Sequence, residues 1–235
     1  MFLVGHAALA FLISYGISRK FGVVSAVSFA AVMLIASLPD IDIIAQEAGI
    51  IPHKSYTHSP IISLAISSVI FLIAKLFLKQ KSIVALIYGL AYLYHIIGDL
   101  IVGPPLNILF PFGYVPIGLG IDFGSLSAEI IEMLLLLLAV GITLRASFAN
   151  NSSRKNNNAI LRYSRIDKIG FALLILALII SFAYLLYNTD SSHSPFFDTE
   201  LQITLFVLLH LMGVAWILLI VLVSRQFAMV PQPEQ

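Results

Sequence analysis

The sequence contains no cysteine. A chain without thiols forms no disulfide, and it has no thiolate zinc site, iron–sulfur cluster or cysteine nucleophile. Charged residues are scarce as well, at 11% of 235 residues, whereas soluble proteins carry about 25%. Hydrophobic residues reach 60%, above the roughly 45–50% of soluble domains. The net charge is +1, whereas nucleic-acid-binding proteins usually carry a strongly positive charge. We therefore expect an integral membrane protein with no nucleic-acid partner.

Several long apolar stretches are candidates for membrane spans. A bilayer core of about 30 Å takes roughly 20 helical residues, and lipid offers backbone groups no hydrogen-bond partner, so only helices or closed barrels cross it. The apolar residues do not alternate as they do in barrel strands, which leaves helices. We predict an all-α, polytopic helical membrane protein with about seven transmembrane helices: Phe2–Ser18, Gly22–Leu38, Ile61–Leu78, Ile83–Val102, Leu126–Ser147, Ile169–Tyr187 and Leu201–Ser224.

The positions of the cations predict the orientation of these spans. Arg19 and Lys20 follow the first apolar stretch instead of preceding it, which does not fit a cleaved signal peptide. With seven spans, 12 of the 13 Lys and Arg fall on one side and Lys54 falls on the other. The positive-inside rule assigns the cation-rich side to the cytoplasm. We expect a multi-pass protein of the cell or inner membrane, with the N-terminus outside and the C-terminus in the cytoplasm.

A polar segment rich in asparagine, Asn150–Asn158, interrupts the apolar pattern. Segments of this composition connect structured parts rather than join a core. We divide the chain into a membrane domain with the candidate metal motifs (residues 1–148), a polar cytoplasmic linker (149–168) and a C-terminal two-helix membrane segment (169–235).

Histidines and aspartates gather at one membrane face in this topology. Asp99 lies one helical turn above His95 on the same face, and His6 lies about one turn inside the first span at 1.5 Å per residue. The others lie in the loops that follow the second span. We expect these residues to share one pocket at the outer membrane boundary: His6, Asp40, Asp42, His53, His58, His95 and Asp99.

Imidazole and carboxylate groups are ligands for zinc, manganese or iron, and a set without thiolates indicates a hydrolytic site rather than a structural one. A bound divalent cation lowers the pKa of its water to about 7 and polarises a carbonyl or phosphoryl oxygen. The set exceeds the needs of one tetrahedral ion, which leaves a two-metal centre or residues that orient the ligands. A different interpretation is that these polar groups pair with one another inside the membrane. Our first-choice ligands are Asp40, His53, His58, His95 and Asp99, followed by His6 and Asp42.

Two further residues are candidates for catalysis. Glu132 falls inside the fifth span, and an intramembrane acid is a functional hypothesis by default, here as a general base or a further ligand. Lys54 is the outer-face cation and a candidate to steady an anionic group of the substrate.

The segment Gly103–Gly124 is apolar but rich in proline and glycine, so it does not form one helix. It is either a lid or re-entrant element over the site, or a loop that lies on the headgroup layer.

The order and spacing of four motifs resemble those of a known family. The motifs are Gly5-His6, Leu38-Pro-Asp-Ile-Asp42, His53-Lys-Ser-Tyr-Thr-His-Ser59 and His95-Ile-Ile-Gly-Asp99, and Gly103 and Pro111 follow them. Over residues 1–125 they look like the YdjM-like family of inner-membrane-associated proteins, for which a metal-dependent hydrolase activity is presumed. The resemblance implies a membrane hydrolase with a metal site and an undefined substrate. The family usually has arginine where this chain has Lys54, which keeps the charge but lacks the planar fork that clamps phosphate.

The leading hypothesis is a membrane-bound, metal-dependent hydrolase with its His/Asp site at the extracytoplasmic boundary. Zinc is the first choice of metal, with manganese or iron as alternatives. A site at the lipid boundary predicts the bilayer as a partner and an amphiphilic substrate such as a lipid phosphoester. The alternative is a cation or proton transporter that uses the same cluster as an ion site, and a purely structural role is a third interpretation.

Overall fold

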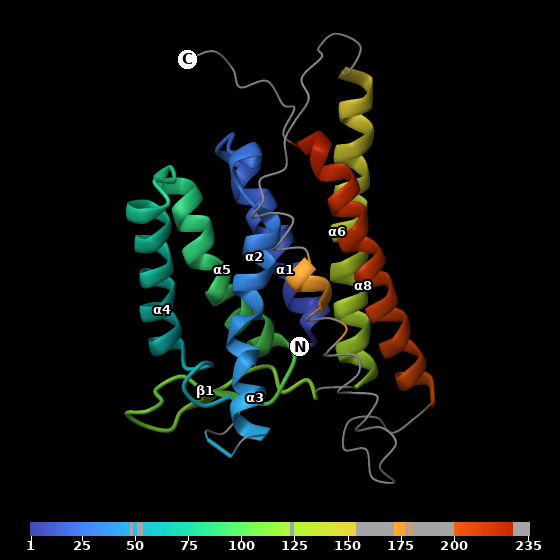
Figure 1. Cartoon of the computed structure of the whole chain (residues 1–235). Coiled ribbons are helices and arrows are strands. Elements are labelled where there is room, and N and C mark those ends of the chain that lie inside the picture. Colours follow the sequence, from blue (N-terminus) through green and yellow to red (C-terminus); the bar gives the residue numbers. More distant parts are fainter. Residues whose placement is uncertain are drawn as a thin grey trace.

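The computed structural model describes residues 1–47, 49–50, 54–122, 125–153, 172–176, 179 and 200–227. Within these ranges the chain is mainly helical (Figure 1). Three helical stretches there are long and apolar enough to cross a membrane: Pro60–Phe77, Ser82–Ile101 and Leu126–Arg145. The expectation of a helical protein with apolar, membrane-length helices is confirmed in this form. The predicted sixth span, Ile169–Tyr187, lies mostly outside the described residues.

Helix α1 (Leu3–Lys20) is the central helix of the bundle. It packs against α2 (Phe29–Ser37), α5 (Ser82–Ile101) and α6 (Leu126–Ser153). Its buried residues include several small ones, among them Ala7, Ala8 and Ala10. Small side chains allow helix backbones to approach closely, so α1 has neighbours on several sides. Its first turn, and His6 with it, is therefore enclosed by protein.

The predicted span Gly22–Leu38 is wrong as a single helix. The chain turns after α1 at Gly22, whose φ of 64° is a left-handed conformation that glycine adopts readily. A short 3-10 turn η1 (Val24–Ala26) follows, and α2 begins only at Phe29, where the Ser28 hydroxyl accepts the backbone N–H of Ala31. Serine is a preferred N-cap residue because it satisfies a helix-end N–H in this way. The cap leaves α2 with nine residues.

The chain then enters the 3-10 turn η2 (Leu38–Ile41), and the short helix α3 (Asp42–Glu47) continues from it. Pro39 stands in the first turn of η2, a position where the missing N–H of proline costs nothing. These two elements carry Asp40 and Asp42 at the end of α2, away from the turn after α1.

Helices α4 (Pro60–Leu72) and α5 form an antiparallel pair. The last turns of α4 widen into η3 (Ile73–Phe77), a π-helical segment. α5 is buried over most of its length, because it also packs against α1 and α2, whereas α4 exposes most of its apolar side chains. An exposed, uniformly apolar helix is typical of a lipid-facing span.

Helix α8 (Glu200–Phe227) packs against α6. The Trp216 indole of α8 donates to the Thr143 hydroxyl of α6 at 3.1 Å, and its ring meets Phe11 of α1 edge-on at 5.3 Å. The described part of the C-terminal region therefore packs against the N-terminal helices. α6 itself continues past Arg145 as far as Ser153.

A small hairpin lies between α5 and α6. Its two-residue strands, β1 (Leu106–Asn107) and β2 (Pro116–Ile117), pair antiparallel. The prediction that this segment is not one helix is confirmed over its described residues.

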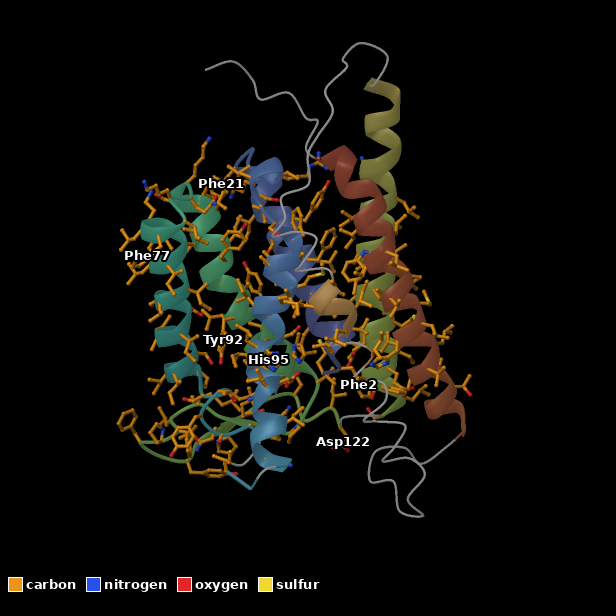
Figure 2. The ribbon with its side chains drawn as sticks, in the orientation of Figure 1. Phe2, Phe21, Phe77, Tyr92, His95 and Asp122 are labelled. Atoms are coloured by element: carbon orange, nitrogen blue, oxygen red, sulfur yellow. The ribbon has the colours of Figure 1, made fainter. Side chains whose placement is uncertain are left out.

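Figure 2 places Phe21 and Phe77 at one end of the bundle and Phe2 and Asp122 at the other. The hairpin and α3 lie at the second end, with His95 inside the bundle on that side (Figures 1 and 2).

Candidate metal centre

Four segments that are distant in sequence bring the candidate ligands together. His6 comes from α1, Asp40 from η2, His58 from the turn before α4, and His95 and Asp99 from α5. They form two groups whose ligand atoms all lie within 4.8 Å of one another: His6, His95 and Asp99, and Asp40, His58 and His95. His53, a first-choice ligand, lies outside the described residues.

The second group has the dimensions of a metal site. Nε2 of His58 lies 3.0 Å from Nε2 of His95, and Oδ1 of Asp40 lies 3.4 Å from each of these nitrogens. A tetrahedral zinc ion with ligands at about 2.0–2.1 Å separates neighbouring ligand atoms by about 3.3 Å. The three donor atoms therefore match one face of a zinc tetrahedron.

The hydrogen bonds behind the two imidazoles direct their Nε2 atoms toward the cluster. Nδ1 of His95 lies 2.8 Å from the carbonyl oxygen of Ala36. A carbonyl only accepts, so Nδ1 of His95 carries the hydrogen, and Nε2 of the neutral ring keeps its lone pair. Nδ1 of His58 lies 3.2 Å from Oδ2 of Asp42. Metal-binding histidines usually have a carbonyl or carboxylate behind the ring in this way.

Asp42 belongs to neither group of donor atoms. Its Oδ2 atom faces Nδ1 of His58, accepts the backbone N–H of Lys54 at 3.1 Å, and accepts the hydroxyl of Thr57. The sequence interpretation left open whether some of the acids orient ligands instead of binding the ion. The structure places Asp42 behind His58, where an orienting acid belongs.

The two carboxylate oxygens of Asp99 face different neighbours. Oδ2 lies 3.3 Å from Nε2 of His58, 3.6 Å from Nε2 of His95 and 3.0 Å from Nζ of Lys54. Oδ1 lies 3.4 Å from Nε2 of His6 and 3.0 Å from the Met1 amino group. Asp99 therefore contacts His58 and His95 through one oxygen and His6 through the other. The oxygen that faces His58 and His95 also forms the ion pair with Lys54.

His6 reaches the cluster through a close approach of two helices. Its ring stacks on the His95 ring at a centroid distance of 3.6 Å and an angle of 13°. A Cβ atom on Gly98 would lie only 2.8 Å from Nδ1 of His6. Gly98 therefore leaves the space that the His6 ring occupies.

Glu132 belongs to neither group of donor atoms. It is fully buried, and its Oε1 atom accepts the backbone N–H of Phe2 at 2.8 Å. A Cβ atom on Gly5 would lie 2.5 Å from its Oε2 atom. Glu132 thus contacts the first turn of α1, which carries His6, and a direct role as ligand or base stays a prediction. Glu129 of the same helix is also buried and belongs to neither group.

The electrostatics of the cluster favour ionised Asp40, which lies beyond the last turn of α2. Burial by itself raises the pKa of this carboxyl group, but the neighbouring imidazoles of His95 and His58 outweigh burial and hold the pKa well below its usual range. An ionised carboxylate is the form that binds a cation.

Sequence reasoning missed some residues that support the cluster. The Thr57 hydroxyl contacts both Asp42 and Nδ1 of His58, and the Tyr92 hydroxyl donates to the Thr57 carbonyl at 3.2 Å. Thr57 stands beside His58 in the third motif, and Tyr92 lies one turn before His95 in α5, so adjacency was an available signal for both. The Ala36 carbonyl gives no signal, since every residue has one.

Taken together, the fold and the cluster define a helical membrane protein with a largely buried set of histidines and aspartates near one end of its bundle. The family model described as YdjM inner membrane protein matches residues 1–189. The chain therefore belongs to this family, and the match extends beyond the motif-bearing residues 1–125. Among curated proteins and among solved structures, nothing matches the chain.

Proposed function

We propose that the protein is a membrane-bound, metal-dependent hydrolase whose site lies at the extracytoplasmic boundary of the membrane. The observation that carries the proposal is the triangle of donor atoms from His58, His95 and Asp40, with sides of 3.0, 3.4 and 3.4 Å. Its size suits a tetrahedral zinc ion, and its donors suit zinc without excluding manganese or iron.

In this proposal His58, His95 and Asp40 hold the ion. Two imidazoles and one carboxylate are a common ligand set of catalytic zinc sites, in which a water takes the fourth position. When bound, the ion supplies Lewis-acid activation of that water and of a carbonyl or phosphoryl oxygen. Asp42 and the Ala36 carbonyl keep the two imidazoles in the orientation that binding needs.

Asp99 is the proposed proton acceptor. Its Oδ2 atom lies 3.3 Å from Nε2 of His58 and 3.6 Å from Nε2 of His95. A carboxylate within hydrogen-bond reach of the attacking water serves as a general base. This role differs from the ligand role that the sequence suggested, and the two roles predict different effects of Asp99→Asn.

Lys54 has two roles in the proposal: it pairs with Asp99, and it offers a positive charge to the substrate. Its Nζ atom lies 3.0 Å from Oδ2 of Asp99, and its side chain is 18% exposed while Asp99 is 1% exposed. Lys54 is thus a cation at the cluster that an incoming substrate can reach. An ammonium group at this position stabilises an anionic substrate group such as a phosphate.

The proposed topology has seven spans with the N-terminus outside, the C-terminus in the cytoplasm, and the same division at residues 148 and 168. In its support, Phe21 and Phe77, which lie near Arg19, Lys20 and Lys75, are at the end of the bundle opposite Phe2 and Asp122 (Figure 2). This separation of cations from the cluster agrees with the positive-inside rule. A site at the outer lipid boundary favours an amphiphilic substrate from the membrane.

Elemental analysis of detergent-purified protein tests the proposal. Wild-type protein is expected to contain one transition metal ion per chain, and His95→Ala is expected to lose it. His210→Ala is the matched control, because His210 is also buried in an apolar helix but belongs to neither group. Wild-type protein without bound metal, or His95→Ala with a wild-type metal content, would contradict the proposal.

A further inference from the structure

The hairpin between α5 and α6 has an unusual surface. Residues 103–121 contain no Lys, Arg, Asp or Glu. Even so, the side chains of Phe112, Tyr114 and Leu119 are 82%, 79% and 71% exposed. Large contiguous apolar surfaces on soluble proteins are uncommon and mark interaction sites. This surface therefore requires a partner that is itself apolar.

The connections of the hairpin place it at the membrane boundary. α5 ends at Ile101 and α6 begins at Leu126, and both helices are long and apolar enough to cross a bilayer. A helix of about 20 residues spans roughly the 30 Å of the hydrocarbon core. A segment held between two such helices stays close to the lipid surface, and Figure 1 shows the hairpin at the same end as α3.

Backbone and side-chain hydrogen bonds fix the shape of the hairpin. The N–H of Gly103 donates to the Ile121 carbonyl at 2.9 Å, and the N–H of Leu119 donates to the Leu100 carbonyl at 2.8 Å. The Asn107 side chain closes the distal turn by donating to the Gly113 carbonyl and accepting the N–H of Val115. The exposed apolar residues are thus presented on an ordered element whose base is bonded to α5.

The same hairpin is attached to the segment that carries His58. The Ser59 hydroxyl donates to the Phe110 carbonyl at 2.6 Å, and the Tyr56 ring meets the Phe110 ring edge-on at 4.9 Å. Both contacts come from the turn before α4, and Ser59 is the residue next to His58. The position of the hairpin and the position of a candidate ligand are therefore coupled.

We propose that the hairpin of residues 103–121 inserts Phe112, Tyr114 and Leu119 into the headgroup layer of the bilayer that holds the helices. Tyrosine favours this layer because its ring is apolar and its hydroxyl is polar, which fits Tyr114, whereas Phe112 and Leu119 contribute apolar surface. The partner is the phospholipid bilayer, since the hairpin is continuous with two helices suited to cross it and carries no charge. If the proposed hydrolase function holds, the bond from Ser59 keeps the His58 turn at the surface from which an amphiphilic substrate arrives.

Site-directed spin labelling tests the insertion, and the cysteine-free chain makes each label unique. Nitroxide-labelled Phe112→Cys and Leu119→Cys proteins are reconstituted in phosphatidylethanolamine/phosphatidylglycerol vesicles. The accessibility of each label to oxygen and to a water-soluble nickel complex is then measured. Val69→Cys, exposed on α4, gives the lipid reference, and Lys81→Cys, exposed before α5, gives the aqueous reference.

We expect both hairpin labels to be more accessible to oxygen than to the nickel complex, as for groups buried about 5–10 Å into the headgroup/acyl boundary. Nickel accessibility equal to that of the Lys81→Cys label would overturn the proposal. So would protection that persists in detergent and grows with protein concentration, because it would identify a second protein copy as the partner. In a second variant, Phe112→Asp with Tyr114→Asp is expected to move the Leu119→Cys label toward water. No step measures catalysis, so the outcome is independent of the proposed hydrolase function.

Discussion

His58 and His95 are 37 residues apart in the chain, yet their Nε2 atoms lie 3.0 Å from each other. Each ring has an oxygen acceptor behind Nδ1, the Asp42 carboxylate for His58 and the Ala36 carbonyl for His95. With hydrogen on both Nδ1 atoms, the two Nε2 lone pairs face each other, and a cation or a proton between them removes their repulsion. The pair is therefore arranged for a positive charge, and the following predictions test how the chain holds it.

The first prediction concerns the acid behind His58. Asp42→Asn leaves the donor triangle in place but removes the carboxylate that orients the His58 ring. Loss of such an outer partner typically weakens metal affinity by about 10–100-fold, so we expect zinc to bind more weakly but still bind. Competition with a chromogenic chelator measures the affinity. Asp122→Asn is the control, because Asp122 is an exposed aspartate at the same end of the bundle. Equal affinity in wild type and Asp42→Asn would show that Asp42 does not orient the site.

The second prediction separates a general base from a ligand at Asp99. Asp99→Asn removes the proton acceptor but leaves His58, His95 and Asp40 unchanged. We expect it to retain wild-type metal content while hydrolysis falls by about 10²–10⁴-fold, the usual contribution of a general base. Elemental analysis and a turnover assay on the same sample measure the two effects. A loss of metal as complete as in His95→Ala would make Asp99 a ligand instead.

The third prediction concerns the close approach of α1 and α5. In Gly98→Ala the added Cβ would lie 2.8 Å from Nδ1 of His6, so the His6 ring has to move. Overpacking of this kind costs about 1–3 kcal/mol, and we expect a lower unfolding temperature in detergent together with weaker metal binding.

Gly141→Ala is the matched control for this substitution. Gly141 also lies inside an apolar helix, α6, but a Cβ atom there would meet nothing within 4 Å. Since alanine is favoured over glycine in helices by about 1 kcal/mol, this variant is expected to be at least as stable as wild type. If Gly98→Ala and Gly141→Ala had the same unfolding temperature and metal affinity, the close packing of His6 against Gly98 would not matter for stability or metal binding.

Much of the candidate site could be predicted from sequence because helical spacing and membrane topology are strong constraints. The i, i+4 spacing placed His95 and Asp99 on one helix face, and the shared loop position of Asp40 and His58 predicted that they lie close together, as they do; the membrane face at which they lie stays a prediction. The rotation of each helix about its axis is not encoded in spacing. For that reason the sequence did not reveal that Asp42 faces the back of His58 or that Glu132 contacts the N–H of Phe2.

The fold was predictable to a similar degree. Apolar length identified the helices α4, α5 and α6. The prediction of a single helix over Gly22–Leu38 was wrong, because hydropathy carries no information about the turn at Gly22 or the N-cap at Ser28. Both residues are local signals of a late helix start, and they outweigh the apolar character of the residues between them.

The fourth prediction distinguishes a hydrolase from a transporter that uses the same residues. A transporter would release a bound cation on the other side of the membrane, whereas the proposed site retains it. In proteoliposomes with an outward or inward zinc gradient, and separately with a proton gradient, we expect no flux above that of His95→Ala vesicles. Flux that wild type supports and His95→Ala abolishes would favour the transporter alternative and contradict the hydrolase.

The last prediction connects the hairpin with the substrate. If an amphiphile reaches the cluster from the bilayer, hydrolysis of a vesicle-borne phosphate ester such as phosphatidic acid requires the exposed residues Phe112 and Tyr114, while a small water-soluble ester does not. We expect Phe112→Asp with Tyr114→Asp to lower turnover of phosphatidic acid and to leave turnover of para-nitrophenyl phosphate and the metal content unchanged. Leu72→Asp, a charge placed on an exposed position at the end of α4 opposite the Ser59–Phe110 bond, controls for general disturbance by a new charge in lipid. An equal loss on both substrates would mean that the hairpin supports the site itself rather than access from the membrane.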